Sequence, residues 1–88
     1  MPTLSMFYGI VIRMNWGDIG QHNTPHFHAF YGEYEASFDL DGEIIAGRFP
    51  SKNAVLVKAW ALLHKDELVA NWTLASNNEE IFRIAPLQ

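Results

Sequence analysis

Two short turn sequences constrain the fold of this chain more than any other feature. Gly32-Glu33 and Asp41-Gly42 separate segments that are rich in β-branched and aromatic residues. Glycine readily adopts the positive φ that two-residue hairpins require, so the first pair predicts a type II′ hairpin and the second a type I′ hairpin. The sequence therefore predicts an antiparallel meander with strands over His26 to Tyr31, Tyr34 to Leu40 and Glu43 to Phe49.

The hairpin register sorts the side chains onto two faces, because successive residues of a strand point to opposite sides. The predicted core face carries Tyr31 with Tyr34, Ala29 with Ala36, Phe27 with Phe38, and then Ile45, Gly47 and Phe49. The predicted opposite face carries Phe30 with Glu35, His28 with Ser37, His26 with Asp39, and then Ile44, Ala46 and Arg48. Arg48 is expected opposite Glu35. The second face therefore gathers most of the groups that are capable of chemistry.

The remaining segments predict one more strand and a helix. Residues 4–14 are apolar on both alternating sides, as in a strand that is covered on both faces, and residues 15–25 have the composition of a loop. After Pro50 the apolar period becomes helical, which predicts a helix from Lys52 to about Ser76 with Ser51 as its N-cap. Its apolar stripe consists of Val57, Trp60, Ala61, His64, Leu68, Trp72 and Ala75.

The expected architecture is α+β, with a small antiparallel meander of roughly three to five strands packed on one long C-terminal helix. Asp66 could cap a second helix, which allows a kink between His64 and Asp66. Residues 81–84 could add a short final strand. We expect a single domain over residues 1–88 in which Phe27, Phe38 and Trp60 are buried while His26 and His28 are not.

Composition bounds the function. The chain has 88 residues, no cysteine and a formal net charge of −4 at pH 7, which excludes disulfides and argues against coating nucleic acid through bulk charge. No secretion signal is recognisable, and the longest apolar stretch is far shorter than the ~20 residues of a membrane span, so we expect a soluble, cytoplasmic protein. A cluster of acidic residues without an intervening base predicts a negative local field that would repel RNA: Glu33, Glu35, Asp39, Asp41 and Glu43.

Three of the four histidines lie in the segment from His22 to His28. Alternating polar residues are what any half-exposed sheet shows, so a structural role is one interpretation. As metal ligands, His26, His28 and Asp39 would form a two-His, one-carboxylate set, with His22 as a fourth ligand for a divalent cation. As acid–base catalysts, His26 and His28 would cleave a phosphodiester while Arg48 holds the phosphate. Further candidate binding residues are His22, Asn23, Glu35, Ser37 and Asp39. His64 is instead expected to be a core histidine with one hydrogen-bonded partner.

Four stretches of the chain resemble one known family. They are Gly9-Ile10-Val11-Ile12-Arg13-Met14, His22-Asn23-Thr24-Pro25-His26-Phe27-His28, the helical pattern Trp60-x3-His64-x6-Asn71-Trp72, and Ile84-Ala85-Pro86-Leu87. Together they look like the bacterial domain-of-unknown-function 4160 family, whose activity is not established. Its members are often suspected parts of toxin–antitoxin-like gene pairs, next to a second small domain of unknown function. The resemblance therefore implies a small protein partner encoded nearby.

Three functions follow as hypotheses. The first is a protein-interaction module that acts through the His-rich sheet face or an exposed edge strand, in the role of a component of a toxin–antitoxin-like pair that the resemblance implies. The second is a metal-independent ribonuclease or other hydrolase that uses His26 and His28 with Arg48. The third is a metal-binding protein that uses the same histidines. A second copy of the chain and RNA both remain open as binding partners, whereas we expect no binding to a membrane.

Overall fold

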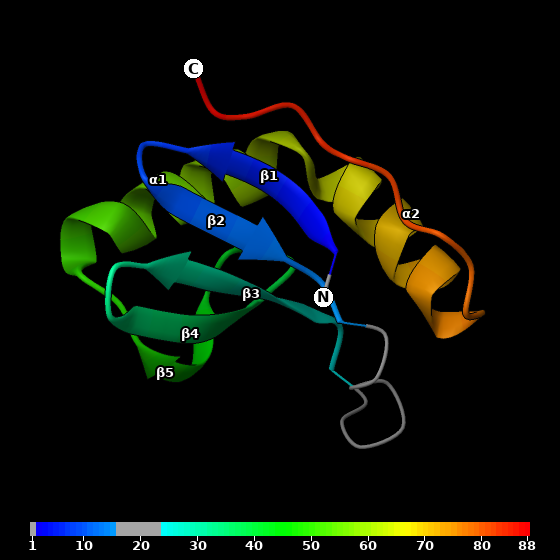
Figure 1. Cartoon of the computed structure of the whole chain (residues 1–88), viewed down its shortest axis with the longest axis horizontal. Helices are drawn as coiled ribbons and strands as arrows, with labels where there is room; N and C mark the ends of the chain where they lie inside the picture. The colour runs from blue at the N-terminus through cyan, green and yellow to red at the C-terminus, as the bar shows by residue number, and fades with distance from the viewer. Residues whose placement is uncertain (1, 16–23) are drawn as a thin grey trace.

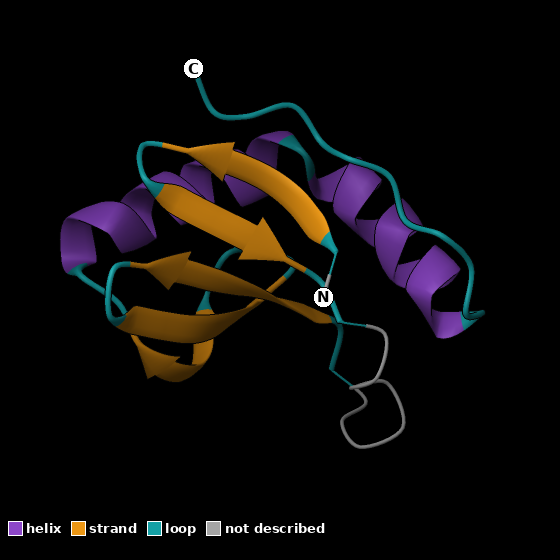
Figure 2. Cartoon of the chain, in the orientation of Figure 1, coloured by secondary structure: helices purple, strands orange, loops and turns teal. Residues whose placement is uncertain are grey.

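The computed structural model describes residues 2–15 and 24–88, which form one antiparallel sheet and two helices (Figures 1 and 2). The elements in chain order are β1 (Thr3–Phe7), β2 (Ile10–Arg13), β3 (His26–Tyr31), β4 (Tyr34–Asp39), β5 (Ile44–Arg48), α1 (Ser51–Leu63) and α2 (Lys65–Ser76). The five strands follow one another across the sheet in the order β1-β2-β3-β4-β5, so the sheet is a simple meander. The α+β class predicted from the sequence is confirmed.

The first strand predicted from the sequence is in fact a hairpin. Residues 4–14 divide into β1 and β2, which turn at Tyr8 and Gly9 with φ angles of 49° and 80°. A tyrosine at positive φ is uncommon, and Tyr-Gly is not among the pairs typical of two-residue hairpins. The run of apolar residues on both sides of this turn therefore concealed it.

The register between β3 and β4 agrees with the prediction at every pair. Tyr31 lies opposite Tyr34, Phe27 opposite Phe38 and His26 opposite Asp39, with the intermediate pairs in step. Gly32 has the positive φ, 55°, that the turn needs. A two-residue turn leaves no freedom in the register, which is why this part of the sheet could be derived from the sequence.

The turn between β4 and β5 differs from the predicted type I′ hairpin. Only Gly42 has a positive φ there, and the turn is wider because the Asp39 backbone N–H donates to the carbonyl of Glu43 at 2.9 Å. A β-bulge at Ile45 then restores the predicted register, so that Ser37 faces Ala46 and Glu35 faces Arg48. The bulge makes Ile44, and not Ile45, the partner of Phe38 on the core face. The predicted sides of these two isoleucines were therefore wrong.

The core lies between the sheet and α1, which Figure 1 shows behind the strands. Trp60 is fully buried, with its ring centroid 5.6 Å from that of Phe27 and 5.5 Å from that of Phe7. Phe27 in turn stacks on Phe38, with 5.6 Å between their ring centroids. The predicted burial of Phe27, Phe38 and Trp60 is confirmed, and large aromatic rings supply much of the apolar contact in this small core.

The single long helix predicted after Pro50 is wrong, because the structure has two helices that meet at His64. The backbone there leaves helical geometry, with φ −116° and ψ 27°. Ser51 is the first residue of α1 and not its cap, and neither helix has a side-chain cap hydrogen bond. Asp66 lies in the first turn of α2, where its negative charge interacts favourably with the positive end of the helix dipole.

The residues after α2 run back along that helix to β1 as an extended tail (Figure 1) and do not form the predicted strand. The buried side chain of Asn71 makes two hydrogen bonds to the backbone of Phe82, at 2.8 and 3.0 Å. The indole of Trp60 donates to the carbonyl of Ala85 at 2.9 Å, and the backbone N–H of Ile84 donates to the carbonyl of Leu4 at 2.8 Å. The tail is therefore fixed to both helices and to the β1 edge of the sheet.

No helix among the described residues is both long enough and apolar enough to cross a membrane.

Candidate functional site

The candidate site lies on the sheet face that points away from Trp60, which we name the outer face. Cross-strand pairing arranges its side chains in two rows across the sheet, Val11–Phe30–Glu35–Arg48 and Arg13–His28–Ser37–Ala46. His26 and Asp39 form a further pair at the start of β3. The structure therefore brings His26, His28, Ser37 and Asp39 to one end of this face, as the sequence predicted.

Arg13 is the arginine beside the histidines, and it is not among the site residues predicted from the sequence. It lies directly opposite His28, and its guanidinium is 5.6 Å from the centroid of the Phe30 ring. Its Nε is buried and makes no hydrogen bond with the described residues. Arg48, the predicted phosphate-binding residue, belongs to the row of Phe30 and Glu35 and not to that of His28. The predicted trio of His26, His28 and Arg48 is therefore not a contiguous group.

Only the pairing of β2 with β3 reveals the place of Arg13. The connection between these strands is long, so no turn fixes their register, and the sequence offered no signal for the contact. A cation above an aromatic ring is a favourable arrangement that also holds the side chain in place. Arg13 thus adds a fixed positive charge to this end of the outer face.

The two histidine rings lie edge to face with 5.2 Å between their centroids. Nδ1 of His26 donates to the carbonyl oxygen of Thr24 at 2.9 Å, so the lone pair of the neutral ring is on Nε2. Nδ1 of His28 lies 3.2 Å from the hydroxyl of Ser37. The Thr24 contact fixes one ring in orientation, and the Ser37 contact links the other to β4.

His26 is buried, contrary to the prediction that it would be exposed. Only 5% of it is accessible, and its ring centroid is 5.4 Å from that of Trp72 on α2. The prediction assumed that the helical stripe covers the core face alone, whereas Trp72 reaches the start of β3. His28 is half-buried.

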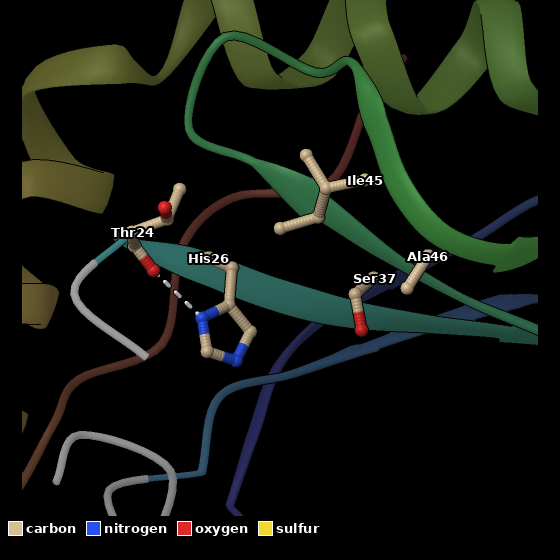
Figure 3. A pocket seen from close by; sticks show the side chains of 5 residues that line it. All are labelled: Thr24, His26, Ser37, Ile45 and Ala46. Carbon is tan, nitrogen blue, oxygen red and sulfur yellow. Dashed lines mark hydrogen bonds between the residues drawn. The ribbon is translucent and has the colours of Figure 1, made fainter. Parts of the chain in front are cut away.

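A hollow of about 180 Å³ lies beside these residues and is lined by Thr24, His26, Ser37, Ile45 and Ala46 (Figure 3). Figure 3 shows the His26 ring and the Ser37 hydroxyl on the same side of the strands. A neighbouring hollow shares Ser37 and Ala46 and extends to Glu35 and Gly47. The small side chains of β5 leave this part of the outer face recessed, with polar groups along it.

The carboxylate of Asp39 stabilises a turn, a role that the metal hypothesis did not include. Its Oδ1 accepts hydrogen bonds from the backbone N–H groups of Asp41 and Glu43, at 3.0 and 2.9 Å, and so shapes the turn between β4 and β5. Among residues 2–15 and 24–88, no three His, Asp or Glu side chains are placed to hold a metal ion. The set of His26, His28 and Asp39 is therefore not assembled as a metal site, while His22 and Asn23 lie outside the described residues.

Two of the five members of the acidic cluster form ion pairs with lysines of the helices. Lys58 on α1 forms an ion pair with Glu43, and Lys65 on α2 forms one with Asp41. The hydrogen bond to Glu43, and then the charge of that carboxylate, raise the pKa of Lys58. These pairs were invisible in the sequence because the lysines follow their partners by 15 and 24 residues.

His64 has the hydrogen-bonded partner predicted for it, but it is half-buried and does not belong to the core. Its ring is packed 5.8 Å from that of Trp60, and its Nδ1 donates to Oε1 of Glu67 at 2.6 Å. It is part of the junction between the helices and not of the outer face.

Comparison with protein families matches residues 9–73 to the model described as Domain of unknown function (DUF4160). The chain belongs to this family. No curated protein and no solved structure matches it. The stretch shared with the DUF4160 family includes the outer-face rows from β2 to β5 and both helices as far as Thr73, but neither β1 nor the tail.

The arrangement has two chemical capacities. The histidine end offers imidazoles, a hydroxyl and an arginine, which could bind an anion or transfer protons. The β5 side offers an edge strand and recessed surface, which could bind another chain.

Proposed function

We propose that this chain is a small protein-binding module, one half of a toxin–antitoxin-like pair, that holds its partner at the β5 side of its sheet. The description of the family assigns no activity. The binding surface is therefore argued from geometry, whereas the toxin–antitoxin-like pair and the neighbouring partner are what the family resemblance implies.

The observation that carries it is the contrast between the two edges of the sheet. The β1 edge receives the tail, through the hydrogen bond between Ile84 and Leu4. At the opposite edge all five residues of β5 are exposed, including Ile44 at 42% and Ile45 at 47%, and no described residue pairs with its outer side. Open edge strands are sites for strand addition, and the bulge at Ile45 and the charge of Arg48 restrict which strands can be added to β5.

The test is co-expression with the product of the neighbouring gene. We expect the two proteins to purify together and Ile45→Lys to abolish the association, because a lysine side chain beside an incoming strand disfavours apolar contact there. Met6→Lys is the matched control, since Met6 on β1 is 57% exposed and lies at the opposite edge of the sheet. Equal loss in both variants, or no association of the wild-type proteins, would refute the proposal.

The toxin–antitoxin role has its own readout. Expression of the chain alone and of its neighbour alone should identify one that slows growth, and co-expression should restore growth. If neither protein slows growth, the pair is not a toxin and antitoxin, although it can still be a complex.

A second candidate function is metal-independent hydrolysis of a phosphodiester, favoured by the His26–His28 contact beside Arg13. One imidazole would act as base and the other as acid, with Arg13 on the phosphate. We expect RNA cleavage in the presence of a metal chelator, lost in His28→Ala and Arg13→Ala but retained in Arg48→Ala. If the wild type does not cleave RNA under these conditions, this candidate is rejected.

A further inference from the structure

We infer that the partner binds β5 as an extended antiparallel strand in which an acidic side chain faces Arg48 and an apolar side chain, three residues further along, faces Ile44. The inference rests on the proposed protein-binding function and adds the chemistry of the bound segment.

The strand β4 shows which side chains match β5. Reading along β4, Glu35 lies opposite Arg48, Ala36 opposite Gly47, Ser37 opposite Ala46 and Phe38 opposite Ile44. A strand on the other side of β5 that keeps the same direction as β4 meets the same row of side chains, with the same alternation between faces. Its best sequence is therefore of the same type, which is acid, small, polar, apolar.

The helix side of the β5 edge has room for the apolar residue. A hollow of about 290 Å³ opens there, lined by Gly42, Glu43, Ile44, Ala54, Val55 and Lys58. Val55 is 66% exposed and Ile44 is 42% exposed, so two apolar side chains lie at the surface of the same hollow. An apolar side chain from an added strand would cover both and extend the core past β5.

Arg48 supplies the charge that selects the acidic residue. It is exposed and lies on the outer face of the edge strand, with Glu35 on its inner side. A guanidinium has five N–H donors, so it can serve a second carboxylate on its open side. An added acidic residue would thus flank Arg48 from the side opposite Glu35.

A second copy of this chain does not provide that match. The five residues of β5 include no acid, so in a two-fold antiparallel pairing of β5 with itself Arg48 of one copy meets no acidic residue of β5 in the other. The geometry therefore favours a different protein over a homodimer, and a homodimer through β5 would overturn the inference.

The experiment uses a synthetic peptide with the sequence of residues 33–40 of this chain as the probe, because it contains the β4 pattern. Titration of the isotope-labelled full chain, followed by amide NMR shifts, should move the signals of residues 44–48 and of the first turns of α1. Shifts confined to His28 and its neighbours, or no saturable binding at millimolar peptide, would overturn the inference.

Charge exchange tests the predicted contact. Arg48→Glu should weaken binding of this peptide about fivefold, the upper range for one cross-strand charge pair. A peptide with lysine in place of Glu35 should bind the Arg48→Glu chain better than the wild type. Arg83→Glu, which alters an exposed cation on the tail, is the matched control and should change neither affinity. If both peptides bind both chains equally, Arg48 does not select the partner.

The two proposals fail in different ways. If the wild-type chain does not purify with its neighbour, the protein-binding function is refuted in the form given. If it does and Ile45→Lys abolishes the complex, but Arg48→Glu leaves the complex unaffected and the peptide does not bind, only the inference about the bound segment is refuted.

Discussion

At the scale of single residues, replacement of a glycine can destabilise the fold in two ways, through backbone strain at positive φ and through steric overlap of the new side chain. Gly32 and Gly42 allow these two effects to be measured separately. Both have positive φ, 55° and 84°. A Cβ at Gly32 would meet nothing within 4 Å, whereas one at Gly42 would lie 2.6 Å from the Cα of Lys58. Gly42 therefore allows α1 to approach the turn between β4 and β5.

We predict that Gly32→Ala costs about 1 kcal/mol of unfolding free energy, from backbone strain alone. Gly42→Ala should cost about 1–3 kcal/mol more, because the new methyl group meets the backbone of a helix that must move. Urea denaturation of both variants measures the difference. Equal losses would show that α1 does not approach this turn as closely as the structure indicates.

At the scale of elements, what could be predicted depended on how each strand is connected. The β3–β4 register followed from a two-residue turn, so the placement of His26, His28, Ser37 and Asp39 on one face could be derived. The sides of Ile44 and Ile45 could not, because the turn closed by the backbone hydrogen bond between Asp39 and Glu43 is wider than the predicted one and a bulge compensates for it. The contact between Arg13 and His28 joins strands that no tight turn connects, so nothing local in the sequence encodes it.

The helices add contacts that are equally remote in sequence. Trp72 buries His26, and the lysines of both helices neutralise Glu43 and Asp41. Asp66 indicated that a second helix could begin near His64, where the structure has the break. Two separate helices and one kinked helix have similar apolar periodicity, so the sequence could not distinguish them. Periodicity identifies an apolar stripe and does not show which sheet residues it meets.

The pair of Lys58 and Glu43 predicts a pH dependence at the alkaline end. The pKa of Lys58 is raised in the folded state from its ordinary 10.5, so the pair stabilises the fold fully below pH 10.5 and loses its effect as pH rises through the higher folded value. The difference in stability between wild type and Lys58→Gln should therefore be small and constant around pH 8–10, and should vanish at higher pH. Chemical denaturation across this range measures it, with Lys52→Gln as the control. A difference that grows with alkaline pH would contradict the pairing.

At the scale of the whole molecule, the two edges of the sheet differ in what covers them: the tail contacts β1, whereas β5 is exposed. The tail makes a backbone hydrogen bond to β1 at Leu4 with residues outside the stretch matched to the family, while β2 to β5 lie inside that stretch. A meander of five strands has two open edges unless something covers them, and both left open would favour aggregation. Under the proposed function, the tail would leave the β5 side as the edge available for strand addition.

This asymmetry gives the last prediction, for a chain that ends at Glu80. Removing residues 81–88 exposes the site of Ile84, which is 3% accessible, and leaves the Trp60 indole and the Asn71 amide without their backbone partners. We expect a loss of roughly 3 kcal/mol or more in unfolding free energy, from lost apolar burial and unpaired polar groups. We also expect self-association, because the β1 edge is then open as well. Tryptophan fluorescence in urea and analytical ultracentrifugation measure the two effects, and removal of Gln88 alone is the control. If the truncated chain is destabilised but stays monomeric, the tail serves the core and not the edge. An uncovered β1 edge would then not pair with other chains, and the tail would play no part in limiting partner binding to β5.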